Sequence, residues 1–287
     1  MKILIIGSKG MLASKVLDVL TAKLDKDIEI FFTSRNQKKK KGSRNINFDI
    51  LKDSKIKNLK IKKFDYIINC AGIIKPFIDE NSDISVYKAI TVNSLFPRKL
   101  SEIFHNSKII QITTDCVYSG IHGKYIETST HDPKDVYGKS KSLGEVKARN
   151  VMNIRCSIIG KEINNYKSLI SWVLSNNDGD TVNGFTNHLW NGVSTDIFAK
   201  LCLGIIKNKF FKSGSYHLVP KNIVNKYELI KLISDRFKKK LNVNKFRTKE
   251  KCDRSISTQN VKMNLKMWKL AGYKSPPTIK EIINEIE

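Results

Sequence analysis

The stretch KILIIGSKGMLA, residues 2–13, decides the fold. Its first part, Lys2–Ile6, is a short and almost wholly apolar run, the pattern of a strand buried inside a parallel sheet. Gly7 and Gly10 follow at once, and the apolar residues from there to Leu24 recur at helical spacing. A glycine turn between a buried strand and a helix lets backbone N–H groups bind a phosphate at the helix N-terminus. The stretch therefore predicts the opening unit of a dinucleotide-binding fold, with an ordinary strand-to-helix turn as the competing interpretation.

Strand and helix patterns alternate through the first 155 residues. Apolar runs predict strands at 28–33, 46–48, 66–70, 108–113 and 151–155, and helical spacing predicts helices at 86–104 and 136–150. Repeated β-α-β units imply a parallel sheet with helices on both faces. We therefore expect an α/β protein with a Rossmann-type, doubly wound parallel sheet over residues 1–157.

The alternation breaks down in the second half of the chain. Gly, Asn and Asp cluster at 176–184, which predicts loops and turns. Helices are predicted at 195–207, at 226–240 and after Pro276-Pro277. We expect a smaller, mixed substrate-binding lobe over 158–287, with residues 191–208 packing back on the first domain.

The chain is strongly basic: its 287 residues include 52 Lys and Arg against 27 Asp and Glu, a formal net charge of +25. Clustered basic residues are the footprint of nucleic-acid binding. Here they scatter through the whole chain, which is typical of a solvated surface, so we expect no nucleic-acid partner. The apolar runs are far shorter than the roughly 20 residues that a bilayer span needs, so we expect no membrane association and a cytoplasmic location.

Five cysteines stand far apart, at positions 70, 116, 156, 202 and 252. They form no CxxC pair and no His/Cys cluster with zinc-ligand spacing. The sequence therefore predicts reduced thiols and no metal site.

The glycine loop and the second and third strands predict a cofactor site. The loop residues expected to line it are Gly7, Ser8, Lys9, Gly10, Met11 and Leu12. The second strand ends at Ser34-Arg35 with no acidic residue, whereas NAD-selective sites place an Asp or Glu there. An Arg suits the 2′-phosphate of NADP(H), so we expect NADP(H), with NAD(H) as the open alternative and a plain surface Arg as the competing interpretation. Asp49, followed by Ile50, is placed to accept a hydrogen bond from the adenine amine.

A YxxxK motif, Tyr137 with Lys141, carries the expected chemistry. At positions i and i+4 of one helix the ammonium lies near the phenol, which we expect to lower the pKa of the phenol. Such a tyrosine can donate a proton to the oxygen of a carbonyl that is being reduced. A second YxxxK, Tyr227 with Lys231, is attributed to chance in a Lys-rich chain. The two differ in context, because Tyr137 follows a strand that ends at Thr114, and ligands bind at such strand ends.

Six short motifs follow one another along the chain. They are GSKGMLA (7–13), NCAG (69–72), VNSLFPRKL (92–100), ITTDCVYSG (112–120), YGKSKSLGE (137–145) and IRCSIIG (154–160). Their order and spacing over about the first 160 residues resemble the extended short-chain dehydrogenases/reductases, specifically the dTDP-4-dehydrorhamnose reductase family. The segments NHLWNGVSTDIFAK (187–200) and DRSIST (253–258) resemble later parts of such reductases from surface-polysaccharide pathways.

The resemblance implies an oxidoreductase that uses NADPH to reduce a 4-keto group on a nucleotide-linked deoxy-sugar, for polysaccharide biosynthesis. It implies that Tyr137 protonates the developing alkoxide, Lys141 holds the nicotinamide ribose and Thr114 binds the substrate oxygen. Further cofactor-site residues implied are Cys70, Ala71, Gly72 and Asn93. For Asn93, ordering of a proton relay and plain helix packing stay open as alternatives.

One difference from related nucleotide-sugar enzymes narrows the range of reactions that this chain can catalyse. Nucleotide-sugar 4,6-dehydratases follow the threonine with Asp-Glu, whereas here Asp115 is followed by Cys116. The machinery for elimination is therefore incomplete. Reduction is favoured, while an epimerase with tightly bound NAD and a non-catalytic, nucleotide-binding regulatory subunit stay open.

The substrate contacts are sought among cations and aromatic residues, because a nucleotide sugar carries a diphosphate and a planar base. The candidates are Lys75, Thr114, Trp190, Asn191 and Arg254. Arg254 is the preferred diphosphate clamp, since a guanidinium binds phosphate bidentately. Competing interpretations are an exposed loop Lys75, a core Trp190 and an Asp253–Arg254 surface pair. Monomer and homodimer both stay open.

Overall fold

Seven parallel strands form the central sheet of the computed structural model, which describes residues 1–35, 44–52, 59, 63–162 and 168–287. They are β1 (Lys2–Ile6), β2 (Glu29–Ser34), β3 (Asn45–Asn47), β4 (Tyr66–Asn69), β5 (Lys108–Thr113), β6 (Val151–Arg155) and β11 (Gly214–His217). Their order is β11-β6-β5-β4-β1-β2-β3, and every neighbouring pair is parallel. The chain order runs outward in opposite directions from β1, which is where open sheets of this kind bind ligands. The predicted doubly wound α/β fold is confirmed.

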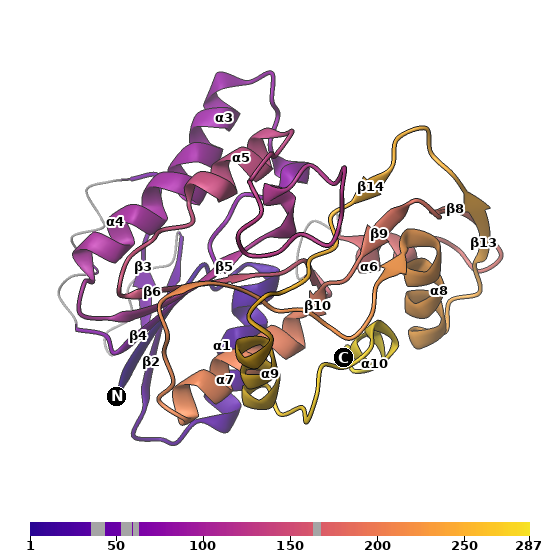
Figure 1. The fold of residues 1–287 in the computed structure, drawn as a ribbon. Coiled ribbons are helices and arrows are strands. Elements are labelled where there is room, and N and C mark those ends of the chain that lie inside the picture. The colour runs from indigo at the N-terminus through magenta and orange to yellow at the C-terminus, as the bar shows by residue number, and fades with distance from the viewer. Residues whose placement is uncertain (36–43, 53–58, 60–62, 163–167) are drawn as a thin grey trace.

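Alternate residues of β1 feed two separate cores. Its odd positions pack with α1 (Met11–Lys23) and α7 (Thr195–Lys207), and its even positions pack with α4 (Phe96–Ile103). Successive side chains of a strand point to opposite faces, so a strand covered on both sides needs an unbroken apolar run. Figure 1 shows the two helix layers, with α1 and α7 on one side of the sheet and α4 and α5 (Val136–Leu143) on the other.

The second half of the chain contributes to both lobes. The helix α7 packs along α1, and Lys15 forms an ion pair with Asp196 across them (2.9 Å). The remaining elements are β7 (Ile158–Ile159), α6 (Leu169–Ser175), β8 (Thr181–Phe185), β9 (His188–Trp190), β10 (Val193–Ser194), β12 (Val224–Asn225), α8 (Lys226–Arg236), β13 (Asn242–Phe246), β14 (Cys252–Asp253), α9 (Val261–Leu270) and α10 (Ile279–Asn284). Their strands make three small sheets, β12-β9-β14, β10-β7 and β13-β8.

The helix expected over 86–104 is interrupted. It consists of α3 (Asp83–Ile90), a π-helical turn over Thr91–Leu95, and α4. Such π turns carry one extra residue per turn and recur at functional sites. This one holds Asn93, which the sequence places in the cofactor site.

Two further boundaries differ from the sequence-based expectation. The helix expected over 136–150 ends at Leu143, and Gly144 follows as its C-cap, where a Cβ would lie 1.9 Å from the carbonyl oxygen of Asn93. The helix expected over 226–240 ends at Arg236, and Lys238 has a positive φ of 54°.

The strands after β6 escaped prediction, and two of them show why. The stretch 176–184, expected as loops, contains the start of β8, which is paired with β13 about sixty residues further on. The strand β11 joins the edge of the main sheet beside β6. Both depend on partners distant in the sequence, which local composition does not reveal.

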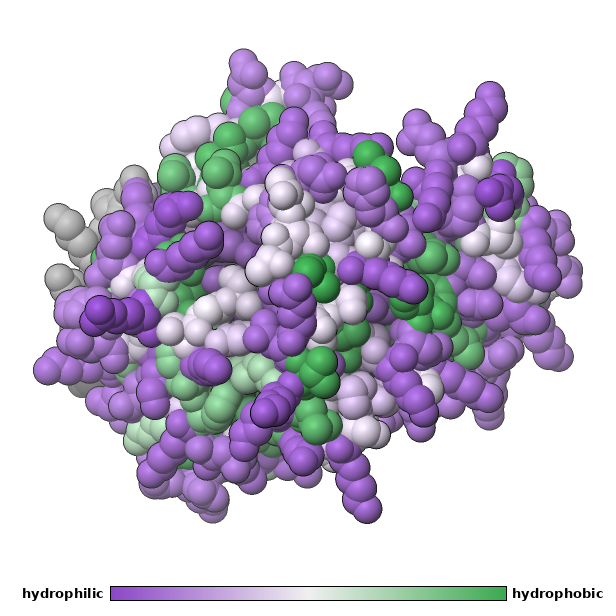
Figure 2. Space-filling model, in the orientation of Figure 1, coloured by the Kyte–Doolittle hydropathy of each residue, from purple (hydrophilic) through white to green (hydrophobic). Residues whose placement is uncertain are grey.

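The surface is dominated by hydrophilic side chains, as Figure 2 shows for one face. This agrees with the large excess of Lys and Arg. Within the described part of the chain, no helix combines the length and apolar character that crossing a membrane requires.

Candidate active site

The loops after β1 and β4 pack tightly against each other. Gly7 has a φ of +90°, and a Cβ there would lie 3.2 Å from the Cα of Ala71, so the position requires glycine. The Ser8 N–H donates to the carbonyl oxygen of Thr33 (3.1 Å), and the Gly10 N–H donates to that of Gly7 (2.8 Å). The predicted glycine loop therefore exists as a tight turn at the point where the strand order reverses.

The other predicted loop residues divide by exposure. Lys9 is exposed, and Met11 opens α1 half-buried. Leu12 packs into the core between α1 and the sheet, so its side chain serves packing. In the loop after β4, Cys70 is half-buried and Gly72 is exposed. Burial raises the pKa of the Cys70 thiol to about 12, which makes it unreactive at neutral pH.

The end of β2 carries Ser34 and Arg35, the two residues predicted to face the adenosine ribose. Ser34 is buried, and its hydroxyl donates to the side-chain oxygen of Asn45 (3.0 Å). Arg35 follows it and is exposed. Asp49 accepts a hydrogen bond from the N–H of Leu51 through Oδ1 (3.1 Å), so it braces its own turn.

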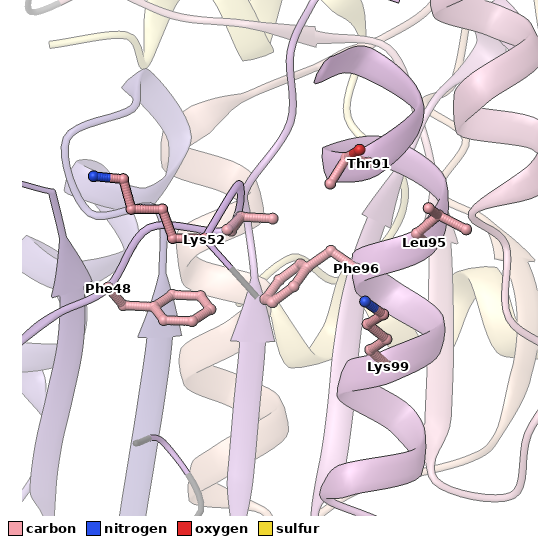
Figure 3. A pocket seen from close by; sticks show the side chains of 7 residues that line it. Phe48, Lys52, Thr91, Leu95, Phe96 and Lys99 are labelled. Atoms are coloured by element: carbon pink, nitrogen blue, oxygen red, sulfur yellow. The ribbon is translucent and has the colours of Figure 1, made fainter. Parts of the chain in front are cut away.

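A small hollow lies beside these residues, with a volume of about 10 Å³. Figure 3 shows the side chains around it, which are Phe48, Ile50, Lys52, Thr91, Leu95, Phe96 and Lys99. Thr91 is buried, and its Oγ1 has no hydrogen-bond partner among the residues that the structure describes. A buried hydroxyl without a partner is uncommon and calls for an explanation such as a missing ligand. Sequence reasoning missed Thr91, because only the tertiary structure brings it beside Ile50.

Asn93 is committed to hydrogen bonds within the protein. Its Oδ1 accepts from the Ile73 N–H (2.9 Å), and its Nδ2 donates to the Ile73 carbonyl (2.9 Å) and to the Ser140 hydroxyl (3.0 Å). Both of its N–H donors are used. These bonds join the loop after β4 to the helix that carries Tyr137, which favours a positioning role.

The turn after β5 places Thr114 next to Tyr137. The Thr114 hydroxyl donates to Oδ1 of Asp115 (3.1 Å) and accepts from the Cys116 N–H (3.1 Å). It also lies within hydrogen-bonding reach of the Tyr137 phenol. The helix α5 approaches this turn so closely that a Cβ at Gly138 would lie 2.2 Å from the carbonyl oxygen of Cys116. The glycine that follows Tyr137 therefore lets the two catalytic candidates meet.

Lys141 is buried one helical turn beyond Tyr137. Its Nζ donates to the carbonyl oxygen of Ile112 in β5 (2.9 Å). Burial lowers the pKa of Lys141 to about 8, against the opposing charges of Glu145, Cys70 and Cys156. Its ammonium is therefore close to its titration range at physiological pH.

The surroundings of Tyr137 shift the pKa of its phenol upward. Burial raises its pKa, Cys116, Asp115 and Asp135 raise it further, and only the Thr114 hydrogen bond acts against them. The expectation of a lowered pKa is therefore wrong. Its physical reason is that burial dominates, while the ammonium of Lys141 is turned to the carbonyl of Ile112.

A buried network lies behind this edge of the sheet, centred on Arg155, which is 1% exposed. Each of its five N–H groups has an acceptor: both carboxylate oxygens of Glu145 (2.9 and 2.5 Å), Nε2 of His131 (3.0 Å), the Tyr118 hydroxyl (2.7 Å) and Nε2 of His217. In the β5–β6 register Arg155 stands opposite Thr113, the neighbour of Thr114. Sequence reasoning missed this network because its members are scattered along the chain.

The network defines the protonation of His217. Its Nδ1 lies 2.6 Å from the carbonyl oxygen of Ser257, which can only accept, so Nδ1 carries the proton. Its Nε2 receives an N–H of Arg155 and must present a lone pair. The ring is therefore neutral. Burial, aided by the charge of Arg155, lowers the pKa of His217 to about 4.

Two predicted substrate contacts are engaged elsewhere. Lys75 forms an ion pair with Asp135 (2.9 Å), the residue that caps α5, although its side chain is 63% exposed. Asn191 is buried and exchanges two hydrogen bonds with the backbone of Ile256 (2.7 and 3.0 Å). The expectation of a free sugar-binding amide at Asn191 is therefore wrong, because the amide ties β9 to the segment after β14.

The other two candidates lie together. Trp190 is buried, and its Nε1 donates to the Ser157 hydroxyl (2.9 Å). Arg254 is half-buried, and its Nε donates to the carbonyl oxygen of Tyr118 (3.0 Å). A residue that the sequence did not single out, Lys226, lies with its Nζ 5.9 Å from the centroid of the Trp190 ring. In the described ranges, no group of three or more His, Cys, Asp and Glu side chains could hold a metal ion.

The seven-stranded sheet, the glycine turn after β1, and Tyr137 and Lys141 on the helix that packs against the Thr114 turn define a Rossmann-fold protein of the short-chain dehydrogenase/reductase class. The family model described as RmlD substrate binding domain matches residues 1–286, and the chain belongs to this family.

Individual relatives agree with this assignment. The chain is 29% identical over 186 residues to a dTDP-4-dehydrorhamnose reductase of Aggregatibacter actinomycetemcomitans, and the match spans 60% of this chain and 61% of that protein. The fold is similar to that of a dTDP-4-dehydrorhamnose reductase of Clostridium acetobutylicum, at 24% identity and a TM-score of 0.76, over 99% of this chain and 98% of the other. The Bacillus anthracis enzyme of that name, solved in complex with NADP, has 21% identity and a TM-score of 0.76, over 99% and 98% of the two chains.

Proposed function

We propose that this protein is an NADPH-dependent reductase of a 4-keto group on a nucleotide-linked deoxy-sugar, serving the synthesis of surface-polysaccharide precursors. The observation that carries the proposal is the position of Tyr137 on α5, which packs directly against the turn that holds Thr114 at the carboxyl end of β5. A reductase needs a proton donor at this place, whereas an abstracting base would need the phenolate. The curated relative and the NADP-bound structural neighbour support the same activity.

The residues present fit a dinucleotide. The tight turn at Gly7 leaves backbone N–H groups at the start of α1 for the pyrophosphate. The unpaired hydroxyl of Thr91 faces the hollow beside Ile50, which at about 10 Å³ has room for one water that would link it to an adenine bound outside. The exposed Arg35, with no acid at the end of β2, favours a 2′-phosphate. We propose accordingly that residues 1–157 bind the cofactor and 158–287 the substrate.

The chemistry at the carbonyl follows from three side chains. The bound cofactor supplies a hydride to the carbonyl carbon. The Thr114 hydroxyl orients the carbonyl oxygen, and Oη of Tyr137 transfers its proton to that oxygen as negative charge develops on it. Lys141, with a pKa of about 8 and its ammonium directed to the carbonyl oxygen of Ile112, would hold the nicotinamide ribose.

Replacing Tyr137 with Phe tests this mechanism. The variant keeps the ring and its packing but lacks the proton donor, so turnover is expected to fall by roughly 10²–10⁴-fold while NADPH affinity is retained. The measurement is NADPH oxidation against 4-keto nucleotide sugars generated in situ, with cofactor affinity from fluorescence titration. Turnover equal to the wild type would overturn the assignment.

A cofactor titration tests the role of Arg35. The wild type is expected to bind NADP(H) more tightly than NAD(H), and Arg35→Ala should lose about 1.5–3 kcal/mol of NADPH binding with little change for NADH. Tighter binding of NAD(H) by the wild type, or co-purification with NAD, would favour an epimerase instead.

A further inference from the structure

Two cations flank the same short strand in the second lobe. Lys226 follows β12 and Arg254 follows β14, and these strands pair with β9 on either side. The strand β9 ends at Trp190, whose indole is fixed by its hydrogen bond to Ser157. Lys226 and Arg254 therefore come from distant parts of the chain to the two sides of β9, and the ammonium of Lys226 lies over the Trp190 ring at 5.9 Å.

The ammonium of Lys226 has no partner of its own. Among the described residues it makes no hydrogen bond or ion pair, and its nearest defined contact is the face of the Trp190 ring at 5.9 Å. The residue is half-buried, and burial lowers its pKa, while the charge of Asp115 acts to raise it. By contrast, Lys75 forms a 2.9 Å ion pair with Asp135 on the other side of the same site.

The position is unfavourable for a cation on structural grounds. Lys226 is the first residue of α8, and the N-terminus of a helix carries partial positive charge. The positive charge of Arg254 also acts on it. The nearby carboxyl is that of Asp115, on which both cations act, and burial raises the pKa of that carboxyl. One carboxylate facing two cations leaves positive charge uncompensated in a half-buried place.

The guanidinium of Arg254 also has N–H groups without an acceptor among the described residues. Its Nε is held by the carbonyl oxygen of Tyr118 (3.0 Å), and no hydrogen bond of its two terminal nitrogens is formed with the described residues. One fixed nitrogen orients the fork and leaves the other two for a ligand. Asp115 directly follows Thr114, so the two cations lie on the side of the site where the sugar would bind.

We propose that Lys226 binds an anionic group of the nucleotide sugar together with Arg254, and that it determines the specificity of the site for that group. The inference rests on the proposed function. The chemistry required is a cluster of anionic oxygens, which the diphosphate or a carboxylate on the sugar would supply. Such a ligand would neutralise the positive charge of Lys226 and Arg254 that Asp115 alone does not balance.

The test compares wild-type protein with Lys226→Met, which keeps the length of the side chain and removes its charge. Isothermal titration uses dTDP, dTDP-glucose and UDP-glucuronate as probes, with NADPH present. We expect Lys226→Met to lower the affinity for at least one probe by about tenfold or more, since a charged hydrogen bond contributes about 1.5–3 kcal/mol to binding. Weaker binding of all three probes assigns the diphosphate, and weaker binding of UDP-glucuronate alone assigns a sugar carboxylate.

Two matched variants control for general effects. Lys231→Met removes an exposed lysine of the same helix, near Tyr227 (5.6 Å from its ring), and should bind every probe like the wild type. Lys226→Arg keeps the charge and should retain most of the affinity. NADPH affinity should be unchanged in all three variants, which shows that they fold.

Equal affinities of the wild type and Lys226→Met for every probe would overturn the inference. If the wild type still reduces 4-keto nucleotide sugars in that case, the proposed function stands alone. If the wild type neither binds the probes nor turns over such sugars, both fail together.

Discussion

Arg155 is buried and Lys226 is half-buried, and the surroundings of the two cations are opposite. Arg155 has an acceptor for each of its five N–H groups, drawn from Glu145 just after α5, from Tyr118 and His131 in loop segments, and from His217 in β11. Lys226 has the face of an indole and a carboxyl that it shares with Arg254. A buried charge is tolerated only when it is paired. The contrast teaches that Arg155 belongs to the scaffold of the site, whereas Lys226 is matched to something that binds there.

The largest effect is expected from breaking the satisfied network. Arg155→Met leaves the Glu145 carboxylate buried without its partner, so the free energy of unfolding should fall by about 3–5 kcal/mol. Urea denaturation measures this. The double variant Arg155→Met with Glu145→Met should recover part of the loss, because it removes both charges. A loss below about 1 kcal/mol for the single variant would show that water reaches Glu145.

The next effect is a loss of stability in acid. The folded-state pKa of His217, about 4, lies below its unfolded value near 6.5. The unfolded chain therefore takes up a proton first as the pH falls. Stability from this residue is fully present above about pH 6.5 and is lost as the pH falls towards 4, with a total of roughly 3 kcal/mol.

His217→Gln provides the comparison. It cannot titrate, so its free energy of unfolding should depend less on pH between 6.5 and 4 than that of the wild type. Denaturant melts at half-unit pH steps give the two slopes. Parallel slopes would mean that His217 is protonated in the folded protein, against the hydrogen bonds it makes.

The smallest effect concerns the orphaned hydroxyl at the other end of the site. Thr91→Val removes a buried group that has no partner, so stability should stay equal or rise slightly. NADPH affinity should fall by about 0.5–1.5 kcal/mol if the hydroxyl binds the adenine. Fluorescence titration and thermal melts of one sample provide both values. A stability loss with unchanged NADPH affinity would assign Thr91 to the scaffold, as Arg155 is.

Much of the fold and part of the site could be predicted from short stretches of sequence. The run Lys2–Ile6 showed a strand covered on both faces, and Gly7 with Gly10 marked the turn after it. The i and i+4 spacing of Tyr137 and Lys141 placed both on α5, next to the turn after β5. These features are local, because the period of the apolar residues and the conformational freedom of glycine act within a few residues.

Other features depended on partners far along the chain. The amide of Asn191 is bound by Ile256, 65 residues away, and β8 exists because β13 pairs with it. The pKa of Tyr137 is raised by burial, which the motif does not encode.

The sequence by itself determined the class of fold, the glycine turn after β1 and the place of Tyr137 and Lys141 on one helix. Only the tertiary structure decided which polar groups are satisfied and which stay open to a ligand, as at Thr91, Lys226 and Arg254. The physical reason is the separation along the chain of the residues that interact. Secondary structure follows from neighbours a few residues apart, whereas the pairing of a buried charge or hydroxyl depends on which distant segments the packed core brings beside it.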